Sequence, residues 1–179
     1  MKINSSKTRD QFPLSTKVII KKILPIYTFL IIIFLVSCLL FTLLALDTSA
    51  VLVILIILFS FLALAMLLIY LYQKWYFSVY FYDFTDDYII IKKGPITPKE
   101  ITIPYERVQD IYVDQDILDR IFGLYDVHLS SAAISSGMEA HIDGVEKQAA
   151  DGLRAFLLQT VKEKMNKHKG SVATNNLKM

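Results

Sequence analysis

Two long runs without a charged residue occupy the first half of the chain and limit what it can fold into. Residues 24–46 and 50–72 contain no Asp, Glu, Lys or Arg, and only Asp47, Thr48 and Ser49 separate them. Each run makes a helix of roughly 35 Å, long enough to span a hydrocarbon core of about 30 Å. Because neither run shows a polar face, buried helices of a soluble bundle are disfavoured. The sequence therefore predicts a transmembrane helical hairpin.

Lys and Arg are unevenly distributed around this hairpin. Residues 1–23 carry six Lys and Arg against one Asp, whereas residues 47–49 carry no Lys or Arg. Basic flanks stay on the cytoplasmic side of a membrane, so we expect a multi-pass protein of the cell membrane with both termini in the cytoplasm. A cleaved signal peptide is disfavoured because the first run is too long for one and a second run follows at once.

The second half of the chain alternates in the manner of a β-protein. Apolar residues recur every second position, and turn residues interrupt the pattern. A bulge is expected near Asp110, and Gly123 is expected to stop a short helix. The predicted strands cover residues 75–84, 88–94, 99–104, 107–116, 125–131 and 138–143, and the short helix covers 117–123.

A longer amphipathic helix is predicted to follow the last strand. Asp143 and Glu146 resemble an acidic capping box at its start, and apolar residues then recur at three and four positions. We predict an α+β membrane protein, in which the transmembrane hairpin precedes a small antiparallel β-barrel or sandwich capped by a C-terminal α-helix. The predicted segments are a basic N-terminal segment 1–23 (its first 14 residues loose), the hairpin 24–72, the β-rich domain 75–167 and a disordered tail 168–179.

Two segments of the second half carry a family resemblance. "YDFTDDYIIIKKGPI" and "ITIPYERVQDIYVDQDILDRIFGLYDVHLSSA" resemble the bacterial pleckstrin-homology-like (PH) domain of YdbS-like membrane proteins over roughly residues 76–163. The resemblance implies a PH-like fold, a tendency to oligomerise and no established enzymatic activity. Ala132-Ala133 departs from the family pattern at one turn. The matching positions are Thr85, Asp87, Gly94, Ile103, Pro104, Arg107, Val108, Gln109, Leu118, Arg120, Gly123, Leu124 and Val127.

Several functional classes find little support in the sequence. The single cysteine, Cys38, cannot form an intrachain disulfide or a thiolate metal cluster. His128 and His141 are expected to face outward as cross-strand neighbours, but two imidazoles without a third ligand make a weak metal site. Residues 74–179 carry 13 Lys and Arg against 15 Asp and Glu. We therefore expect no catalytic site, cofactor, metal, small-molecule substrate or nucleic acid.

Lipid head groups are a possible ligand because PH domains often bind them. The first turn of the predicted domain holds Asp83, Asp86 and Asp87, which repel phosphate. Ordinary topogenic charge and a solvated loop are the competing interpretations of the remaining cations. The possible lipid contacts are Lys21, Lys22, Lys92, Lys93 and Lys99.

The leading functional hypothesis is a non-catalytic scaffold or assembly module at the cytoplasmic membrane face. The hairpin would supply membrane location and leave the domain surface available for a second copy or another membrane protein. Tyr105, Tyr112 and Tyr125 are expected to be partly exposed, and aromatic residues of this kind often anchor interfaces. The alternative is an auxiliary membrane protein that senses anionic lipid, and an enzyme would require a pocket with convergent titratable groups.

Overall fold

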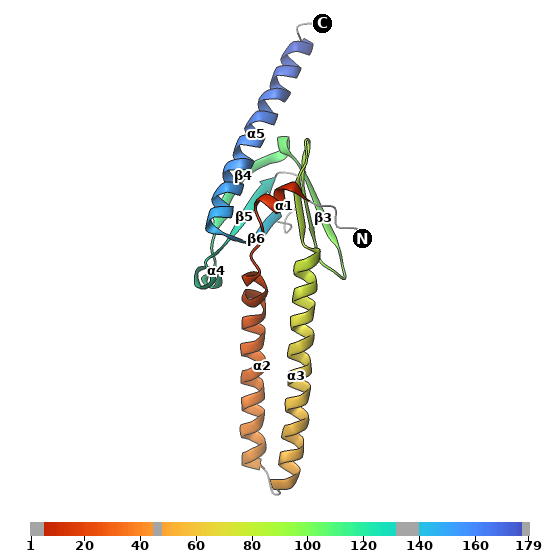
Figure 1. Cartoon of the computed structure of the whole chain (residues 1–179), viewed down its shortest axis with the longest axis vertical. Helices are drawn as coiled ribbons and strands as arrows, with labels where there is room; N and C mark the ends of the chain where they lie inside the picture. The colour runs from red at the N-terminus through yellow and green to blue at the C-terminus, as the bar shows by residue number, and fades with distance from the viewer. Residues whose placement is uncertain (1–5, 45–47, 132–139, 177–179) are drawn as a thin grey trace. The chain divides into compact units, whose positions relative to one another are not determined.

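The chain forms two compact units. The helical unit is Ile19–Ser78, and the β domain combines Met1–Val18 with Val79–Met179. The β domain is thus built from both ends of the chain, with the helical unit inserted between them. The computed structural model describes residues 6–44, 48–131 and 140–176 (Figure 1).

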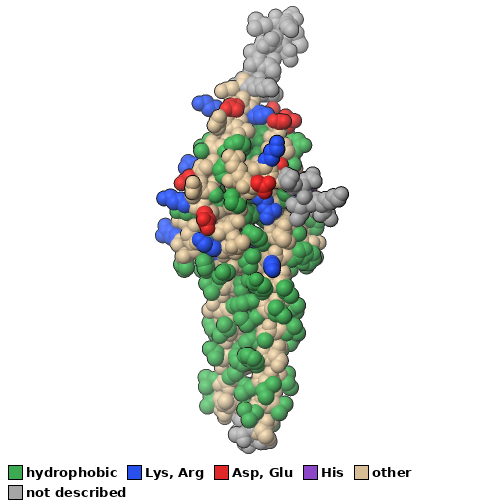
Figure 2. Space-filling model, viewed as in Figure 1, with side chains coloured by type: hydrophobic (Ala, Val, Ile, Leu, Met, Phe, Trp, Pro, Cys, Tyr) green, Lys and Arg blue, Asp and Glu red, His purple; other side chains and the backbone are tan. Residues whose placement is uncertain are grey.

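The helical unit consists of α2 (Lys17–Leu44) and α3 (Thr48–Val79). Both helices are long and apolar enough, by length and composition, to cross a membrane. The hydroxyl of Tyr27 on α2 donates to the carbonyl of Met66 on α3. Hydrophobic side chains cover the visible face of this unit, whereas the β domain shows mixed charge (Figure 2). These features agree with the predicted pair of apolar helices.

The β domain contains two three-stranded antiparallel sheets. The N-terminal sheet has the order β1-β2-β3 and the C-terminal sheet the order β4-β5-β6. The described strands form no closed barrel, so the barrel alternative is wrong, whereas the predicted antiparallel α+β fold is confirmed. The strands are β1 (Phe81–Phe84), β2 (Tyr88–Lys93), β3 (Lys99–Pro104), β4 (Val108–Asp114), β5 (Leu124–Ser131) and β6 (Ala140–Glu146).

The core of the β domain lies between the sheets and helix α5 (Lys147–Asn176). Ile89 and Ile91 alternate inward on β2, and Leu153 and Leu157 are fully buried on α5. Burying each such side chain contributes about 1.5–3 kcal/mol relative to leaving it in water. The apolar side chains that recur every second residue in the strands and every third or fourth residue in α5 therefore pack in one core.

Several local predictions are confirmed. The strand predicted at 99–104 coincides with β3, and the register shift between Val108 and Asp110 is the expected bulge. Helix α4 (Ile117–Phe122) ends at Gly123, whose φ of 67° is left-handed. A turn of 3₁₀ helix, η1 (Tyr105–Arg107), connects the two sheets.

Three segment predictions differ from the structure. Helix α3 continues to Val79, so residues 75–79 are helix and not strand. Each residue added to an existing helix forms one further backbone hydrogen bond, and this gain outweighs the β propensity of residues 75–79. Asp143 and Glu146 lie in β6 and form no capping box, because Gly144 at φ 72° lets the strand continue through a bulge. Helix α5 continues to Asn176, into the predicted disordered tail.

The N-terminal segment is ordered against the β domain. Residues 6–18, here the strap, include helix α1 (Lys7–Gln11), whose first turn is capped when Ser6 Oγ accepts the N–H of Arg9 at 3.0 Å. The prediction of a loose segment at residues 1–14 is therefore wrong from Ser6 onward. Residues 1–5 and the departure at Ala132-Ala133 lie outside the described residues.

Candidate functional site

The strap begins on β1, an edge strand of the N-terminal sheet. Ser6 Oγ lies 2.7 Å from the carbonyl oxygen of Tyr82 and 2.8 Å from the carboxylate of Asp83. Thr8 Oγ1 donates to the same carboxylate at 3.0 Å and accepts the N–H of Phe84 at 3.3 Å. Side chains of the strap therefore satisfy polar groups along an edge that would otherwise be open to another chain.

The middle of the strap packs on α5. The ring of Phe12 lies 6.1 Å from that of Phe156, and a Cβ on Gly152 would meet Phe12 Cε1 at 2.7 Å. The hydroxyl of Tyr82 donates to the carbonyl of Phe12. Burial raises the pKa of Tyr82 well above its ordinary value, and Arg9 opposes this only in part.

The end of the strap covers β6, the edge strand of the C-terminal sheet. Leu14 forms an antiparallel bridge with Val145, and the N–H of Ser15 donates to the carbonyl of Gly144 at 2.9 Å. A Cβ on Gly144 would overlap Val18 Cγ2. The strap thus occupies one edge of each sheet.

An ion pair ends this contact. Lys17 Nζ lies 3.1 Å from Glu146 Oε1. The hydrogen bond and charge of Lys17 lower the pKa of the Glu146 carboxyl. Ser15 Oγ also donates to Glu146 at 3.3 Å. The sequence offered one signal for the strap, a serine at the N-cap position of α1.

A row of three aromatic rings, here called the ring row, crosses the outer face of the C-terminal sheet. Tyr112 on β4 stacks on His128 on β5, with ring centroids 4.8 Å apart and planes at 4°. His128 stacks in turn on His141 on β6, at 5.4 Å and 23°. The register pairs the two histidines directly, which confirms the prediction that they are outward cross-strand neighbours.

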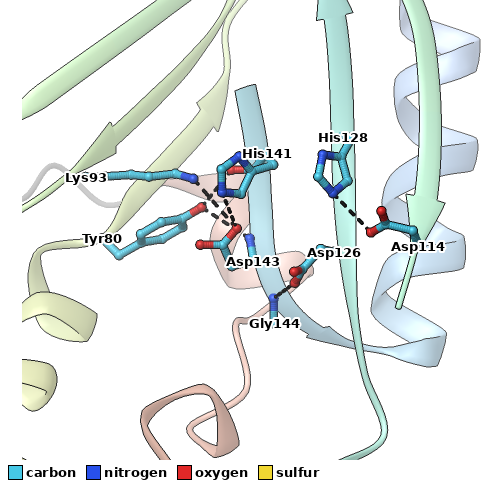
Figure 3. Close-up of polar contacts among 8 residues, drawn as sticks. All are labelled: Tyr80, Lys93, Asp114, Asp126, His128, His141, Asp143 and Gly144. Carbon is cyan, nitrogen blue, oxygen red and sulfur yellow. Dashed lines mark hydrogen bonds and ion pairs between the residues drawn. The ribbon is translucent and has the colours of Figure 1, made fainter. Parts of the chain in front are cut away.

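Each histidine in this row pairs with a carboxylate of its own sheet. His128 Nε2 lies 3.0 Å from Asp114 Oδ1, and His141 Nε2 lies 2.9 Å from Asp143 Oδ1 (Figure 3). Asp126, on the same face, accepts the N–H of Gly144 at 2.7 Å. Among the described residues, no group of three or more His, Cys, Asp or Glu side chains is placed to hold a metal ion.

Asp143 connects this face to the other sheet. Lys93 Nζ on β2 lies 3.7 Å from Asp143 Oδ1 and 5.2 Å from the ring centroid of Tyr80. The hydroxyl of Tyr80 donates to the carbonyl of His141 at 3.0 Å and accepts the N–H of Asp143 at 3.3 Å (Figure 3). Chemically, this is a set of charge-assisted contacts that join β2 to β6.

The predicted lipid-contacting lysines do not gather into one patch. Lys92 forms an ion pair with Glu100 at 3.1 Å, whereas Lys93 turns toward Asp143. Lys99 is exposed at the start of β3. In the helical unit, Lys21 and Lys22 lie on α2, and Lys22 Nζ lies 4.9 Å from the ring centroid of Tyr76.

The three predicted interface tyrosines have different environments. Tyr105 is buried, which contradicts its expected exposure; its hydroxyl donates to the carbonyl of Thr85 at 2.8 Å. Burial, followed by the charges of three nearby aspartates, raises the pKa of Tyr105 to about 12. Tyr112 is 38% exposed and Tyr125 is half-buried on β5. Of the three, Tyr112 is the best placed to meet a partner.

Two antiparallel sheets followed by a C-terminal helix define a PH-like domain. Residues 26–161 match the family model described as bacterial PH domain, and the matched range includes most of α2, all of α3 and the sheets. The chain therefore belongs to the bacterial PH domain family. The strap lies before the matched range. No match was found among curated proteins or among solved structures.

Proposed function

We propose that this chain is a non-catalytic, membrane-anchored PH-like scaffold that self-associates or docks another membrane protein. One observation carries the proposal. The strap precedes the two apolar helices in the sequence and residues 79–176 follow them, yet both segments belong to a single β domain. The domain is thus joined to the two apolar helices at two points, Val18 and Val79. A domain held this way does not need its own lipid site to reach a membrane.

The same observation supports a hairpin that crosses the membrane twice. Residues up to Val18 and from Val79 belong to one compact domain, which favours a hairpin whose two ends emerge on the same side. The basic residues of segment 1–23, including Lys21 and Lys22, favour the cytoplasmic side. We infer a multi-pass protein of the cell membrane with both termini in the cytoplasm. Within the family, the motif from Ile103 to Val127 supports a YdbS-like member.

The native mass of the full-length chain, purified in mild detergent from its own cells, tests the scaffold. A defined homo-oligomer or a second membrane protein in fixed ratio is the expected result. A monomer without a partner would overturn the proposal in this form.

Two tyrosines of similar exposure allow a sharper test of where a partner binds. Tyr112 is 38% exposed on the C-terminal sheet and Tyr88 is 40% exposed on the N-terminal sheet. A photoreactive amino acid at position 112 should crosslink to the partner more strongly than one at position 88. Equal crosslinking from both positions would show that the ring row is not a specific binding site for the partner.

The alternative function, sensing of anionic lipid, has weaker support. Its candidate cations are Lys92, Lys93 and Lys99, and the first two already have carboxylate partners. It predicts that nanodiscs with anionic lipid change the oligomeric state of the full-length chain in a salt-dependent way. Indifference to lipid charge would exclude it.

A further inference from the structure

Helix α4 presents apolar residues to solvent and buries a charged one. Ile117 is 80% exposed and Ile121 is 67% exposed, whereas Asp119 is fully buried. Residues four apart share one face of a helix, so the two isoleucines form one outward apolar face. Burial of such side chains is favourable, and the described β domain leaves both of them exposed to solvent.

Local capping explains why α4 forms in spite of this exposure. The Asp116 carboxylate accepts the N–H of Asp119 at 2.6 Å, and the Asp119 carboxylate accepts the N–H of Asp116 at 3.2 Å. Gly123 ends the helix in the left-handed conformation. The capping box stabilises the N-terminal end of α4 and Gly123 stabilises its C-terminal end, so α4 can exist without burying its isoleucines.

Strand pairing places α4 at the end of the domain that leads into the apolar helices. Leu124 starts β5 directly after Gly123, the residue that ends α4, and pairs with Glu146, the last residue of β6. Glu146 is the ion-pair partner of Lys17, the first residue of α2. The exposed face of α4 therefore lies at the end of the C-terminal sheet where the strap continues into α2.

The N-terminal sheet adds a third exposed isoleucine at the corresponding end. β1 starts at Phe81, just after α3, and Phe81 pairs with Lys92 near the end of β2. The turn after β2 thus lies where α3 leads into the domain, and it exposes Ile96 by 68%. Figure 1 shows this turn and α4 at the same end of the β domain. The three most exposed large hydrophobic side chains of the described β domain all lie here.

The chemistry of this end fits a bilayer surface better than it fits water. Exposed Arg120 lies beside Ile121, and exposed Lys99 follows the turn that holds Ile96, although exposed Asp116 and Glu100 also lie at this end. Apolar side chains flanked by cations are typical of segments that enter the headgroup layer. The opposite end of the N-terminal sheet carries exposed Asp86 and Asp87 instead.

The lengths of the helices agree with this assignment. Val18 and Val79 lie roughly 10 Å along their helices from the ends of the charge-free runs, at residues 24 and 72. This distance is comparable to the thickness of one headgroup layer, about 5–10 Å. The chain therefore enters and leaves the β domain about one headgroup layer beyond the ends of the charge-free runs.

We propose that α4 and the β2–β3 turn form a bilayer-contacting surface, in which Ile117, Ile121 and Ile96 insert into the headgroup layer of the membrane that α2 and α3 cross. This inference rests on the proposed membrane anchoring. The ligand is the apolar part of the lipid interface, so the contact does not require anionic lipid. Its effect is to orient the domain and leave the opposite end and the ring row toward the cytoplasm.

Quenching by brominated lipid tests this surface in the full-length chain. A fluorophore is attached to Ile121→Cys in a Cys38→Ser background, and the protein is placed in nanodiscs of zwitterionic phosphatidylcholine with or without brominated acyl chains. Tyr88→Cys in the same background is the matched control at the opposite end of the N-terminal sheet. The wild-type chain labelled at Cys38, inside the charge-free run 24–46, reports separately whether α2 crosses the bilayer.

We expect brominated lipid to quench the fluorophore at positions 121 and 38 and to leave the fluorescence at position 88 unchanged. Quenching at 38 but not at 121 overturns this inference and leaves the membrane anchor standing. Failure to quench at 38 overturns the anchoring itself, and this inference with it. Equal quenching at 121 and 88 also contradicts the proposed surface. Disulfide crosslinking between copies through Ile121→Cys, without quenching, would assign the surface to a second copy of the chain and overturn the lipid contact.

Discussion

The end of the strap and α4 lie at the same end of the C-terminal sheet. Helix α1 of the strap and helix α4 each have a side-chain cap, but the two segments present opposite surfaces. The strap buries Ser6 and Thr8 and contacts β1, α5 and β6 in turn. Helix α4 buries Asp119 and exposes Ile117 and Ile121. Capping can therefore form a short helix without deciding whether its apolar face is covered.

The largest expected effect concerns the point where the strap meets β6. Gly144 has φ 72°, and a Cβ there would overlap Val18 Cγ2. Gly144→Ala should lower the free energy of unfolding by about 1–2 kcal/mol for the left-handed backbone and by about 1–3 kcal/mol more for overpacking. Thermal unfolding of the full-length chain, followed by the β-sheet signal in circular dichroism, measures the change.

Gly123→Ala is the matched control at the end of α4. Gly123 has a similar φ of 67°, but a Cβ there would meet nothing within 4 Å. It should show the backbone cost alone. Equal losses in the two variants would mean that the strap does not pack on Gly144 in solution, and the comparison would fail.

The next effect concerns the start of the strap. Ser6→Ala removes the cap of α1 and the contacts with Tyr82 and Asp83. A lost cap costs about 0.5–2 kcal/mol, and hydrogen exchange of the β1 amides should become faster because the strap opens. Lys7→Ala, at an exposed position of the same helix, serves as control. Unchanged exchange in Ser6→Ala would show that β1 is protected without the strap.

A smaller effect should follow pH at the exposed end of the strap. Lys17 lowers the pKa of Glu146 in the folded chain, so this pair stabilises the fold above the unfolded pKa, about 4.3 for glutamate. The contribution is lost as the pH falls through the lower folded pKa. Thermal unfolding of Glu146→Gln should therefore depend less on pH below about 5 than that of the wild-type chain. Identical acid profiles would exclude the pair as a contributor.

Sequence patterns predicted the strands and helices of the domain better than the long-range contacts, such as those of the strap, that cover them. Alternation correctly paired His128 with His141, because side-chain direction in a strand depends on local geometry. The strap escaped prediction because its contacts join residues far apart in sequence; Ser6 and Tyr82 are separated by 76 positions. The junction of Asp143 with Lys93 was missed for the same reason, since Asp143 was assigned to a helix cap. The short helix predicted over 117–123 places Ile117 and Ile121 on one face, because residues four apart share a face, but this spacing does not show what covers that face.

The smallest expected effect on folding comes from the face of α4 itself. Substitution of an exposed side chain usually changes the free energy of unfolding by no more than about 0.5 kcal/mol. The double variant Ile117→Ser, Ile121→Ser should therefore keep the unfolding temperature of the β domain. Ile142→Ser, at a fully buried position of β6, should lower the stability by about 2–5 kcal/mol. Thermal unfolding in detergent measures both.

The same double variant should still change how the domain meets the membrane. With Ile96→Cys in the Cys38→Ser background as the labelled site, loss of both α4 isoleucines should reduce quenching by brominated lipid, because a major part of the apolar contact is gone. A variant that destabilises the fold and leaves quenching unchanged would show that α4 packs against protein. The exposed isoleucines would then stabilise the fold, as the strap does, and the two segments would no longer differ in role.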